Sequence, residues 1–171
     1  MFILKLILLT ILFCTSTIIG MLISKKYSNR VKILKDLKKA LNIFEIKINF
    51  SFETIPEIFT EIAEKTYGVA GKIFADTVKF INENNVCAGE AWEKAVEANG
   101  ESLKNDDIKS IKTLGKLLGK TDIEGQTSQI KLVNAFLETQ ISDATEEKNK
   151  NEKMYQKLGA IVGLIMVIVL I

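Results

Sequence analysis

The chain has 171 residues, enough for one domain together with membrane segments, and its apolar residues, 47% of the total, are concentrated at the two ends. A net charge of +2 excludes the strongly basic domain that nucleic-acid binding requires, so no nucleic-acid partner is expected. Histidine is absent, which removes the usual general base near neutral pH and the commonest metal ligand, and a single proline indicates a largely helical chain.

The first element is an uncharged stretch of nineteen residues, Leu6 to Ser24, which Lys25 and Lys26 end. At about 1.5 Å per residue it is long enough to cross a hydrocarbon core of about 30 Å. The competing interpretation is a cleaved secretory signal, but residues 15–20 form only a poor cleavage site. Residues 1–24 are therefore predicted to be a retained N-terminal transmembrane helix.

Basic residues follow this stretch and predict its orientation. Those in residues 25–39 are Lys25, Lys26, Arg30, Lys32, Lys35, Lys38 and Lys39, against one acid, Asp36. Four more precede the C-terminal apolar run, namely Lys148, Lys150, Lys153 and Lys157. Because lysine and arginine beside membrane spans stay in the cytoplasm, residues 25–157 are expected to form a cytoplasmic domain. The basic run at residues 25–39 is equally suited to bind anionic lipid headgroups or to set the topology alone; its members nearest the first span are Lys25, Lys26, Arg30 and Lys32.

Three helices are predicted in the first half of this domain. The first continues the membrane helix, with apolar residues every three or four positions: Val31, Leu34, Leu37, Leu41, Phe44 and Ile48. The second begins with Thr54 as N-cap and Glu57 closing a capping box, with Pro56 in its first turn. After a turn at residues 67–71, the third helix is expected over residues 73–81.

The fourth and fifth helices follow residue 87. The fourth is expected over residues 88–96, where an apolar side places Trp92 in the core. The fifth is predicted as one helix over residues 105–118. Its adjacent acids, Asp106 and Asp107, are expected on solvated faces of the helix.

The sixth helix is predicted to run from Asp122 to Ile171, after a capping box of Thr121 and Glu124. Its last fourteen residues, 158–171, are apolar, which is short for a full crossing but favours a C-terminal membrane segment over an interfacial or buried one. Two glycines in this segment, four positions apart, favour close packing against another helix. The expected fold class is all-α: a six-helix bundle whose first and last helices extend into membrane-anchoring segments.

No catalytic, cofactor-binding or metal-binding residue is predicted. The glycine-lysine pairs at residues 115–116 and 119–120 lack the preceding strand of a phosphate-binding loop. Cys14 and Cys87 do not indicate a disulfide framework or a metal cluster, and both are expected to be reduced and buried. The chain is therefore not expected to be an enzyme.

Several motifs together are specific for one protein family. The strongest is a pair of leucine-glycine dipeptides followed by an acid and a glutamine: Leu114, Gly115, Leu118, Gly119, Asp122 and Gln126. Shorter matches include Tyr27, Ser28, Arg30, Glu45, Pro56, Ala91, Trp92, Glu93, Tyr155, Leu158, Gly159 and Gly163. Over essentially its whole length the chain resembles the stage III sporulation protein AB family of endospore-forming bacteria.

This resemblance implies a component of the mother-cell complex that spans the gap to the forespore, located in the mother-cell membrane that faces the forespore. It implies a helical domain similar to those of the inner-membrane platform proteins of type II secretion and type IV pilus systems. The implied partners are a secretion-type ATPase, stage III sporulation protein AA, and other membrane components of the same complex. Platform proteins usually carry two such domains, whereas this chain has one, which suggests a homo-oligomer.

The polar residues of the matched motifs are the candidate partner contacts: Arg30, Glu45, Glu93, Asp122 and Gln126. The structural alternatives are that Asp122 caps the sixth helix and that Glu45 pairs with a neighbouring lysine. The rival function is a generic membrane-anchored scaffold or signalling adaptor, whose sixth helix forms a coiled coil with another copy of the chain.

Overall fold

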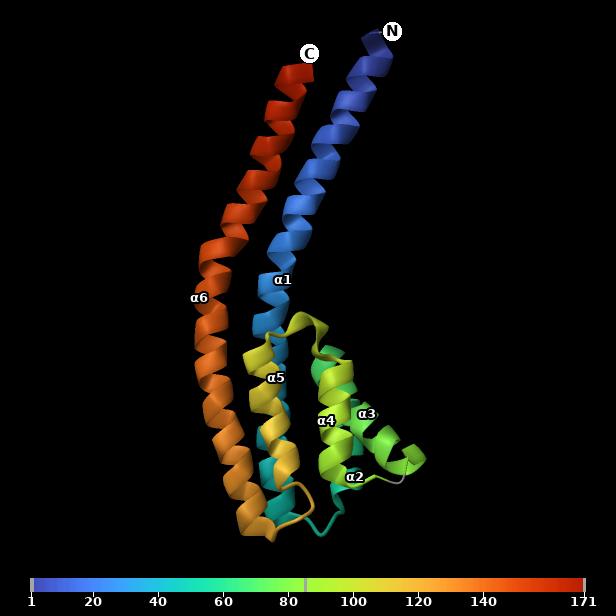
Figure 1. The fold of residues 1–171 in the computed structure, drawn as a ribbon, viewed down its shortest axis with the longest axis vertical. Coiled ribbons are helices and arrows are strands. Elements are labelled where there is room, and N and C mark those ends of the chain that lie inside the picture. Colours follow the sequence, from blue (N-terminus) through green and yellow to red (C-terminus); the bar gives the residue numbers. More distant parts are fainter. Residues whose placement is uncertain (1, 85, 171) are drawn as a thin grey trace. The chain divides into compact units, whose positions relative to one another are not determined.

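Six α-helices and two 3-10 turns make up the fold of this computed structural model, which describes residues 2–84 and 86–170 (Figure 1). In chain order they are α1 (Phe2–Phe50), α2 (Ile55–Lys65), α3 (Gly68–Asn84), α4 (Ala88–Ala98), η1 (Gly100–Ser102), α5 (Asn105–Lys112), η2 (Thr113–Lys116) and α6 (Ile123–Leu170). The described residues contain no strand, and α1 and α6 are much longer than the other helices. The predicted all-α bundle with extended first and last helices is confirmed.

The chain divides into two compact units, and α1 and α6 each contribute to both. Residues 1–31 and 143–171 form one unit, which contains the two apolar helix ends and is called the hairpin unit. Residues 32–142 form the other, which contains the remaining helices and is called the bundle unit. The predicted membrane borders, after residue 24 and before residue 158, both fall within the hairpin unit.

The core of the bundle unit is built around four aromatic rings. Phe59 lies at the centre, with ring centroids 4.9 Å from Phe44, 4.8 Å from Phe74 and 5.7 Å from Trp92. All four side chains are fully buried, and the indole Nε1 of Trp92 donates a hydrogen bond of 2.9 Å to the carbonyl of Ile111. The predicted core position of Trp92 is confirmed, and its one polar atom is satisfied there.

The start of α2 follows the prediction, whereas α3 begins earlier. The backbone N–H of Thr54 donates to the Glu57 carboxylate at 2.7 Å, which is one half of the expected capping box. The turn predicted over residues 67–71 is shorter, because Gly68, with φ of +77°, already starts α3. Gly71 then lies inside the helix, where a Cβ would be 1.8 Å from the Thr66 carbonyl oxygen. The glycines that predicted a loop instead permit a tight helix–helix corner.

The fifth helix is shorter than predicted. It ends at Lys112, and the chain tightens into η2 over Thr113–Lys116. The prediction that both adjacent acids are solvated is wrong for Asp107, which is fully buried and accepts a 2.9 Å hydrogen bond from the backbone N–H of Lys104. Asp107 therefore satisfies an otherwise unpaired donor at the start of α5.

The cap of α6 is also one residue away from its predicted place. The carboxylate of Asp122 accepts the backbone N–H of Gly125 at 2.9 Å, so Asp122 is the N-cap, and the predicted box of Thr121 with Glu124 is wrong. Threonine and aspartate are both favoured N-cap residues and are adjacent here, so the sequence does not decide which of them caps α6.

Within the bundle unit, α1 and α6 run antiparallel in a constant register. Polar pairs line one edge of their contact, each about one turn from the next: Lys38 with Glu138, Asn42 with Asn134, Glu45 with Lys131, and Asn49 with Thr127. The apolar stripe of α1 lies beside this edge and is buried, as predicted: Val31, Leu34, Leu37, Leu41, Phe44 and Ile48. Of these six residues, Val31 belongs to the hairpin unit and the others to the bundle unit.

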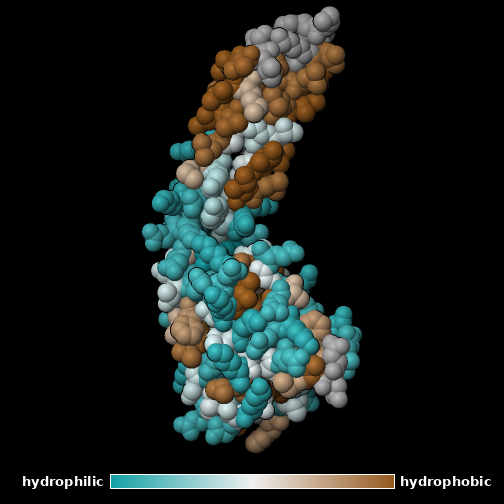
Figure 2. All heavy atoms as spheres, in the orientation of Figure 1, coloured by the Kyte–Doolittle hydropathy of each residue, from teal (hydrophilic) through white to brown (hydrophobic). Residues whose placement is uncertain are grey.

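The hairpin unit has an apolar exterior. Figure 2 shows hydrophobic residues covering the visible surface of the two paired helix ends. Among the described residues, α1 is the one helix long and apolar enough to cross a membrane, with a mean hydropathy of 2.3 over an 18-residue stretch. Cys14, on this exterior, and Cys87, before α4, are both exposed, so the expectation that they are buried is wrong.

Candidate membrane anchor and partner-binding surfaces

Small residues form the contact between the two apolar helix ends of the hairpin unit. A Cβ on Gly20 would lie 2.9 Å from the Cα of Gly159 and 2.7 Å from the carbonyl oxygen of Tyr155, so both backbones approach as closely as glycine allows. The hydroxyl of Ser16 donates to the Gly159 carbonyl at 2.8 Å, and Gly163 packs against Phe13. The helix against which the C-terminal glycines pack is therefore α1 of the same chain.

Polar contacts follow directly after this apolar seam. Gln156 donates to the Ser24 hydroxyl at 3.1 Å, and the rings of Tyr27 and Tyr155 stack with centroids 5.8 Å apart and planes 13° from parallel. The hydrogen bond with the Tyr155 hydroxyl raises the pKa of Tyr27, with a smaller contribution from desolvation. These contacts, called the neck here, hold α1 and α6 together where the apolar exterior ends.

Arg30 is the last polar contact of the hairpin unit. Its side chain is only 7% exposed and donates a 2.8 Å hydrogen bond to the Glu147 carboxylate on α6. A buried guanidinium requires such a partner, because an unpaired charge away from water is strongly destabilising. Of the five candidate partner contacts, Arg30 is thus the one that joins two helices in the hairpin unit.

The other four candidates lie in the bundle unit and do not form one cluster. Glu45 is 3.8 Å from Lys131, and Glu93 is 3.3 Å from Lys112, so each is in an ion pair between two elements. Asp122 caps α6. Gln126, one turn later, is 9% exposed, and its side-chain amide donates to the Thr121 carbonyl at 3.1 Å. Each candidate therefore has an intramolecular role, and partner contact by any of them remains a prediction.

The leucine-glycine motif is explained by packing. Leu114 and Leu118 are buried in the core at 1% and 2% exposure. A Cβ on Gly115 would lie 2.7 Å from the carbonyl oxygen of Gly89, which indicates that η2 and α4 touch through their backbones. Gly119 has a φ of +73°, a left-handed conformation that reverses the chain ahead of α6. The leucines and glycines of the motif thus build the corner before α6.

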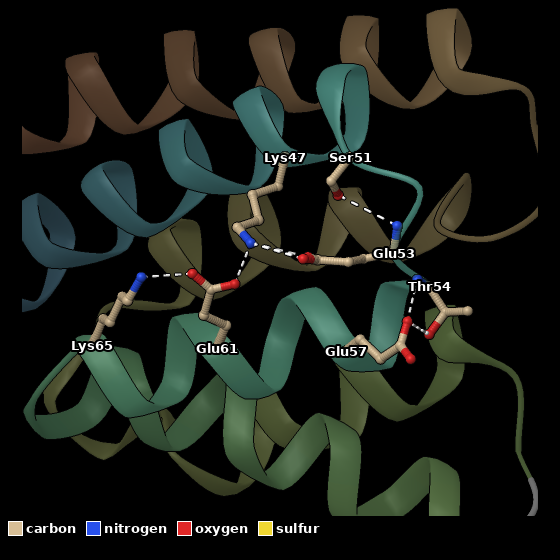
Figure 3. Close-up of polar contacts among 7 residues, drawn as sticks. All are labelled: Lys47, Ser51, Glu53, Thr54, Glu57, Glu61 and Lys65. Carbon is tan, nitrogen blue, oxygen red and sulfur yellow. Dashed lines mark hydrogen bonds and ion pairs between the residues drawn. The ribbon is translucent and has the colours of Figure 1, made fainter.

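A network of ion pairs joins the end of α1 to α2 (Figure 3). The Lys47 ammonium bridges the carboxylates of Glu53, at 3.0 Å, and Glu61, and Glu61 also pairs with Lys65 at 2.6 Å. The hydrogen bonds from Lys47 and then Lys65 lower the pKa of Glu61, while Glu61 and Glu53 raise the pKa of Lys47. The network fixes the angle at which the chain leaves α1.

Four exposed apolar residues belong to or directly follow the end of α1 or begin α6, and sequence reasoning missed them. We define the tip patch as four side chains of the bundle unit where α1 ends and α6 begins; with their exposed fractions they are Ile46 (61%), Phe50 (85%), Phe52 (109%) and Ile123 (52%). The hydrogen bond of 3.1 Å between Asn49 and Thr127 holds those two helix ends together. The available signal was that Ile46 and Phe50 are four residues apart and off the buried stripe of α1.

No group of three or more histidine, cysteine, aspartate or glutamate side chains that could hold a metal ion occurs in the described part of the chain. The clustered carboxylates, such as Glu53 and Glu61, are instead paired with lysines.

Comparison with known proteins identifies the family. A sequence model described as stage III sporulation protein AB matches residues 5–171, which is nearly the whole chain. The chain belongs to the stage III sporulation protein AB family. It is 28% identical over 153 residues to the stage III sporulation protein AB of Bacillus subtilis (strain 168), covering 88% of this chain and 90% of that protein. The resemblance inferred from the leucine-glycine motif is confirmed.

A solved structure of a stage III sporulation protein AB has the same fold. It superposes with a TM-score of 0.65 at 23% identity, and the match covers 70% of this chain and 96% of the other. The curated relative and the structural relative are both named as sporulation proteins and not as enzymes. For a stage III sporulation protein AB, the long apolar α1 is consistent with a membrane anchor.

Proposed function

We propose that this stage III sporulation protein AB is a non-enzymatic platform that docks a cytoplasmic secretion-type ATPase to membrane components of the mother-cell-to-forespore complex. The ATPase is the family's expected partner, stage III sporulation protein AA. The hairpin unit anchors the chain in the mother-cell membrane that faces the forespore, and the bundle unit lies in the cytoplasm. Work done by ATP hydrolysis belongs to the partner, and this chain transmits it through α1 and α6.

The single observation that carries this proposal is the tip patch. Exposed apolar side chains scattered singly are ordinary, but four of them near two helix ends that a hydrogen bond joins support the proposal of a binding surface. Phe50 and Phe52 are the natural anchors, because buried aromatic side chains contribute most of the binding energy at many interfaces. The candidate contacts nearest to this patch in sequence are Glu45, on α1, and Asp122, on α6, and they would belong to its polar rim.

Coupling through helices is supported by the way α1 and α6 are held together. The neck, the Arg30–Glu147 pair and the polar pairs of the bundle unit leave few turns of either helix without a lateral contact. Long helices joined in fixed register move as a pair, so a displacement imposed on one is imposed on the other. The proposal therefore assigns transmission to these helices and recognition to the tip patch.

The test is a calorimetric titration of the full chain, in lipid nanodiscs, with purified stage III sporulation protein AA. We expect saturable binding that weakens at least tenfold when both Phe50→Ser and Phe52→Ser are present, the effect of losing about 1.4 kcal/mol or more. Tyr67→Ser is the matched control, since Tyr67 is 86% exposed in the same unit but between α2 and α3. Absence of binding by the folded chain would reject the docking function.

The second candidate function is the generic scaffold that self-associates through α6. The apolar side of α6 that would form this coiled coil is already buried within the bundle unit, where Ile130, Val133 and Leu137 are all at 0% exposure. This side is not available to a second copy unless α6 leaves the bundle. Sedimentation of the full chain in detergent separates the two functions, because concentration-dependent dimers without ATPase binding would favour the scaffold.

A further inference from the structure

Four lysines surround the neck of the hairpin unit. Two come from α1 and two from α6: Lys25, Lys26, Lys153 and Lys157. All four are exposed, and none of them forms an ion pair or a side-chain hydrogen bond within the described residues. We call this set the lysine collar.

The nearest acids do not neutralise the collar. Glu147 is engaged with Arg30 at 2.8 Å, and Glu152 is 3.7 Å from Lys148. On α1, the first acid after the apolar stretch is Asp36, about three turns beyond Lys25 and Lys26. The positive charges of the collar are therefore available to pair with an anionic group of another molecule.

The contacts of the neck hold the lysines of α1 and those of α6 at about the same position along the two paired helices. The Ser24–Gln156 hydrogen bond and the stacked Tyr27–Tyr155 rings lie between the pairs that α1 and α6 contribute. A single flexible basic segment would be disordered before binding, whereas these lysines start from fixed helical positions. Less entropy is lost on binding when the groups are held in place beforehand.

The collar borders directly on exposed apolar surface. On α1 the preceding residues Met21, Leu22 and Ile23 are exposed by 54%, 62% and 42%. On α6 the following residues Leu158 and Ile161 are exposed by 44% and 52%. A ligand that matches this surface has an anionic end next to a long apolar part, and a free phosphate ion lacks the second feature.

We propose that the lysine collar binds the headgroups of anionic phospholipids, with their acyl chains along the adjoining apolar surface of α1 and α6. The phosphate oxygens pair with the lysine ammonium groups, and the tyrosine hydroxyls lie at the depth where amphipathic aromatic side chains are favoured. The inference rests on the proposed membrane anchorage but is independent of ATPase docking. It gives the anchor a preference for anionic lipid, beyond simple insertion into any bilayer.

The test is native mass spectrometry of the full chain in a neutral detergent, titrated separately with phosphatidylglycerol and phosphatidylcholine. We expect phosphatidylglycerol to bind at least tenfold more tightly. A variant in which the four collar lysines are replaced by glutamine should lose this preference, since each lysine near a membrane surface contributes about a fivefold effect. The matched control carries the same four replacements at Lys35, Lys39, Lys79 and Lys120, which are exposed lysines of the bundle unit, and should keep it.

Three outcomes would overturn the proposal. Equal affinity for the two lipids would show that the chain has no preference for anionic lipid. Equal loss of the preference in the collar and control variants would show that it depends on the net charge of the chain and not on the collar. Displacement of phosphatidylglycerol by soluble glycerol phosphate at matched concentration would identify a phosphate site and not a lipid site. If the collar variant does not fold, the unchanged chain provides the test. Its preference for phosphatidylglycerol must disappear in 1 M salt, where the screening length is about 3 Å, and a preference that persists would contradict the proposal. The ATPase titration is unaffected by any of these results.

Discussion

The same two helices meet in both units, and they do so with opposite chemistry. In the hairpin unit the small residues Ser16, Gly20 and Gly159 form the contact, while large apolar side chains face outward. In the bundle unit the large residues face inward, with Leu37 and Leu137 fully buried. Water favours burial of large apolar side chains, but in lipid that driving force is absent and close packing takes its place. The change in contact chemistry along α1 and α6 is consistent with the proposed membrane anchorage of the hairpin unit.

The largest expected effect is a loss of stability of the bundle unit alone, when a ring is removed from its aromatic core. Phe59→Ala should destabilise the bundle by about 4 kcal/mol, since deleting a buried ring leaves a cavity. Urea unfolding of the full chain in detergent, followed by fluorescence of the single tryptophan, Trp92, measures this change. Phe52→Ala, at a side chain that is fully exposed, is the control and should leave the unfolding midpoint unchanged. Equal losses in both variants would contradict the assigned core.

The hairpin contact is tested by adding volume where glycine is required. Gly20→Leu should separate the apolar helix ends at a cost of about 1–3 kcal/mol, as overpacking does elsewhere. The readout is cross-linking by a short thiol reagent between Ser24→Cys and Gln156→Cys, in a chain whose own two cysteines are replaced by serine. Cross-linking should fall several-fold, while Trp92 fluorescence reports an unchanged bundle.

For that experiment Met21→Leu is the control, because Met21 is the exposed neighbour of Gly20 and lies away from the contact. If Gly20→Leu cross-links as efficiently as this control, the apolar ends do not pack through their glycines. The contrast between the two units would then have to be abandoned.

At the polar edge of the bundle, a substitution is expected to increase stability, by a smaller amount than the losses above. Asn134 donates to Asn42 at 2.9 Å, but its own buried Oδ1 has no hydrogen-bond partner in the described structure. Asn134→Leu should therefore raise the free energy of unfolding by about 1 kcal/mol, because an unsatisfied buried acceptor is removed. Ser128→Leu, at an exposed position of α6, should leave it unchanged. A clear loss of stability in Asn134→Leu would show that the pair stabilises the bundle as well as setting its register.

The smallest effect is a pH dependence carried by the ion pairs after α1. The lowered pKa of Glu61 means that its contribution to stability is present above the ordinary value of 4.5 and is lost as the pH falls through the lowered pKa. Thermal unfolding of the full chain between pH 6 and pH 3 should show a decline that Glu61→Gln reduces. Glu64→Gln, at an exposed neighbour, should preserve the decline. An identical profile in all three proteins would leave the network without an energetic role.

Local patterns predicted most of the helices and little of what joins them. The apolar stripe of α1, the start of α2 at Thr54 and Glu57 and the buried Trp92 follow from periodicity and capping rules. The early end of α5 does not, because the contact between Gly89 and Gly115 that accompanies it joins residues far apart in sequence. Asp107 was misjudged for a similar reason, since its burial depends on how α5 packs.

Composition, short-range periodicity and the leucine-glycine motif were enough to predict the all-α class, the apolar ends and the family. The packing of Gly159 on Gly20, the hydrogen bonds of Asp122 and Gln126 at the start of α6, and the exposure of apolar residues near the end of α1 and the start of α6 became clear only from the folded structure. These contacts depend on which faces of distant helices meet, and a periodic pattern specifies a buried face without specifying what covers it.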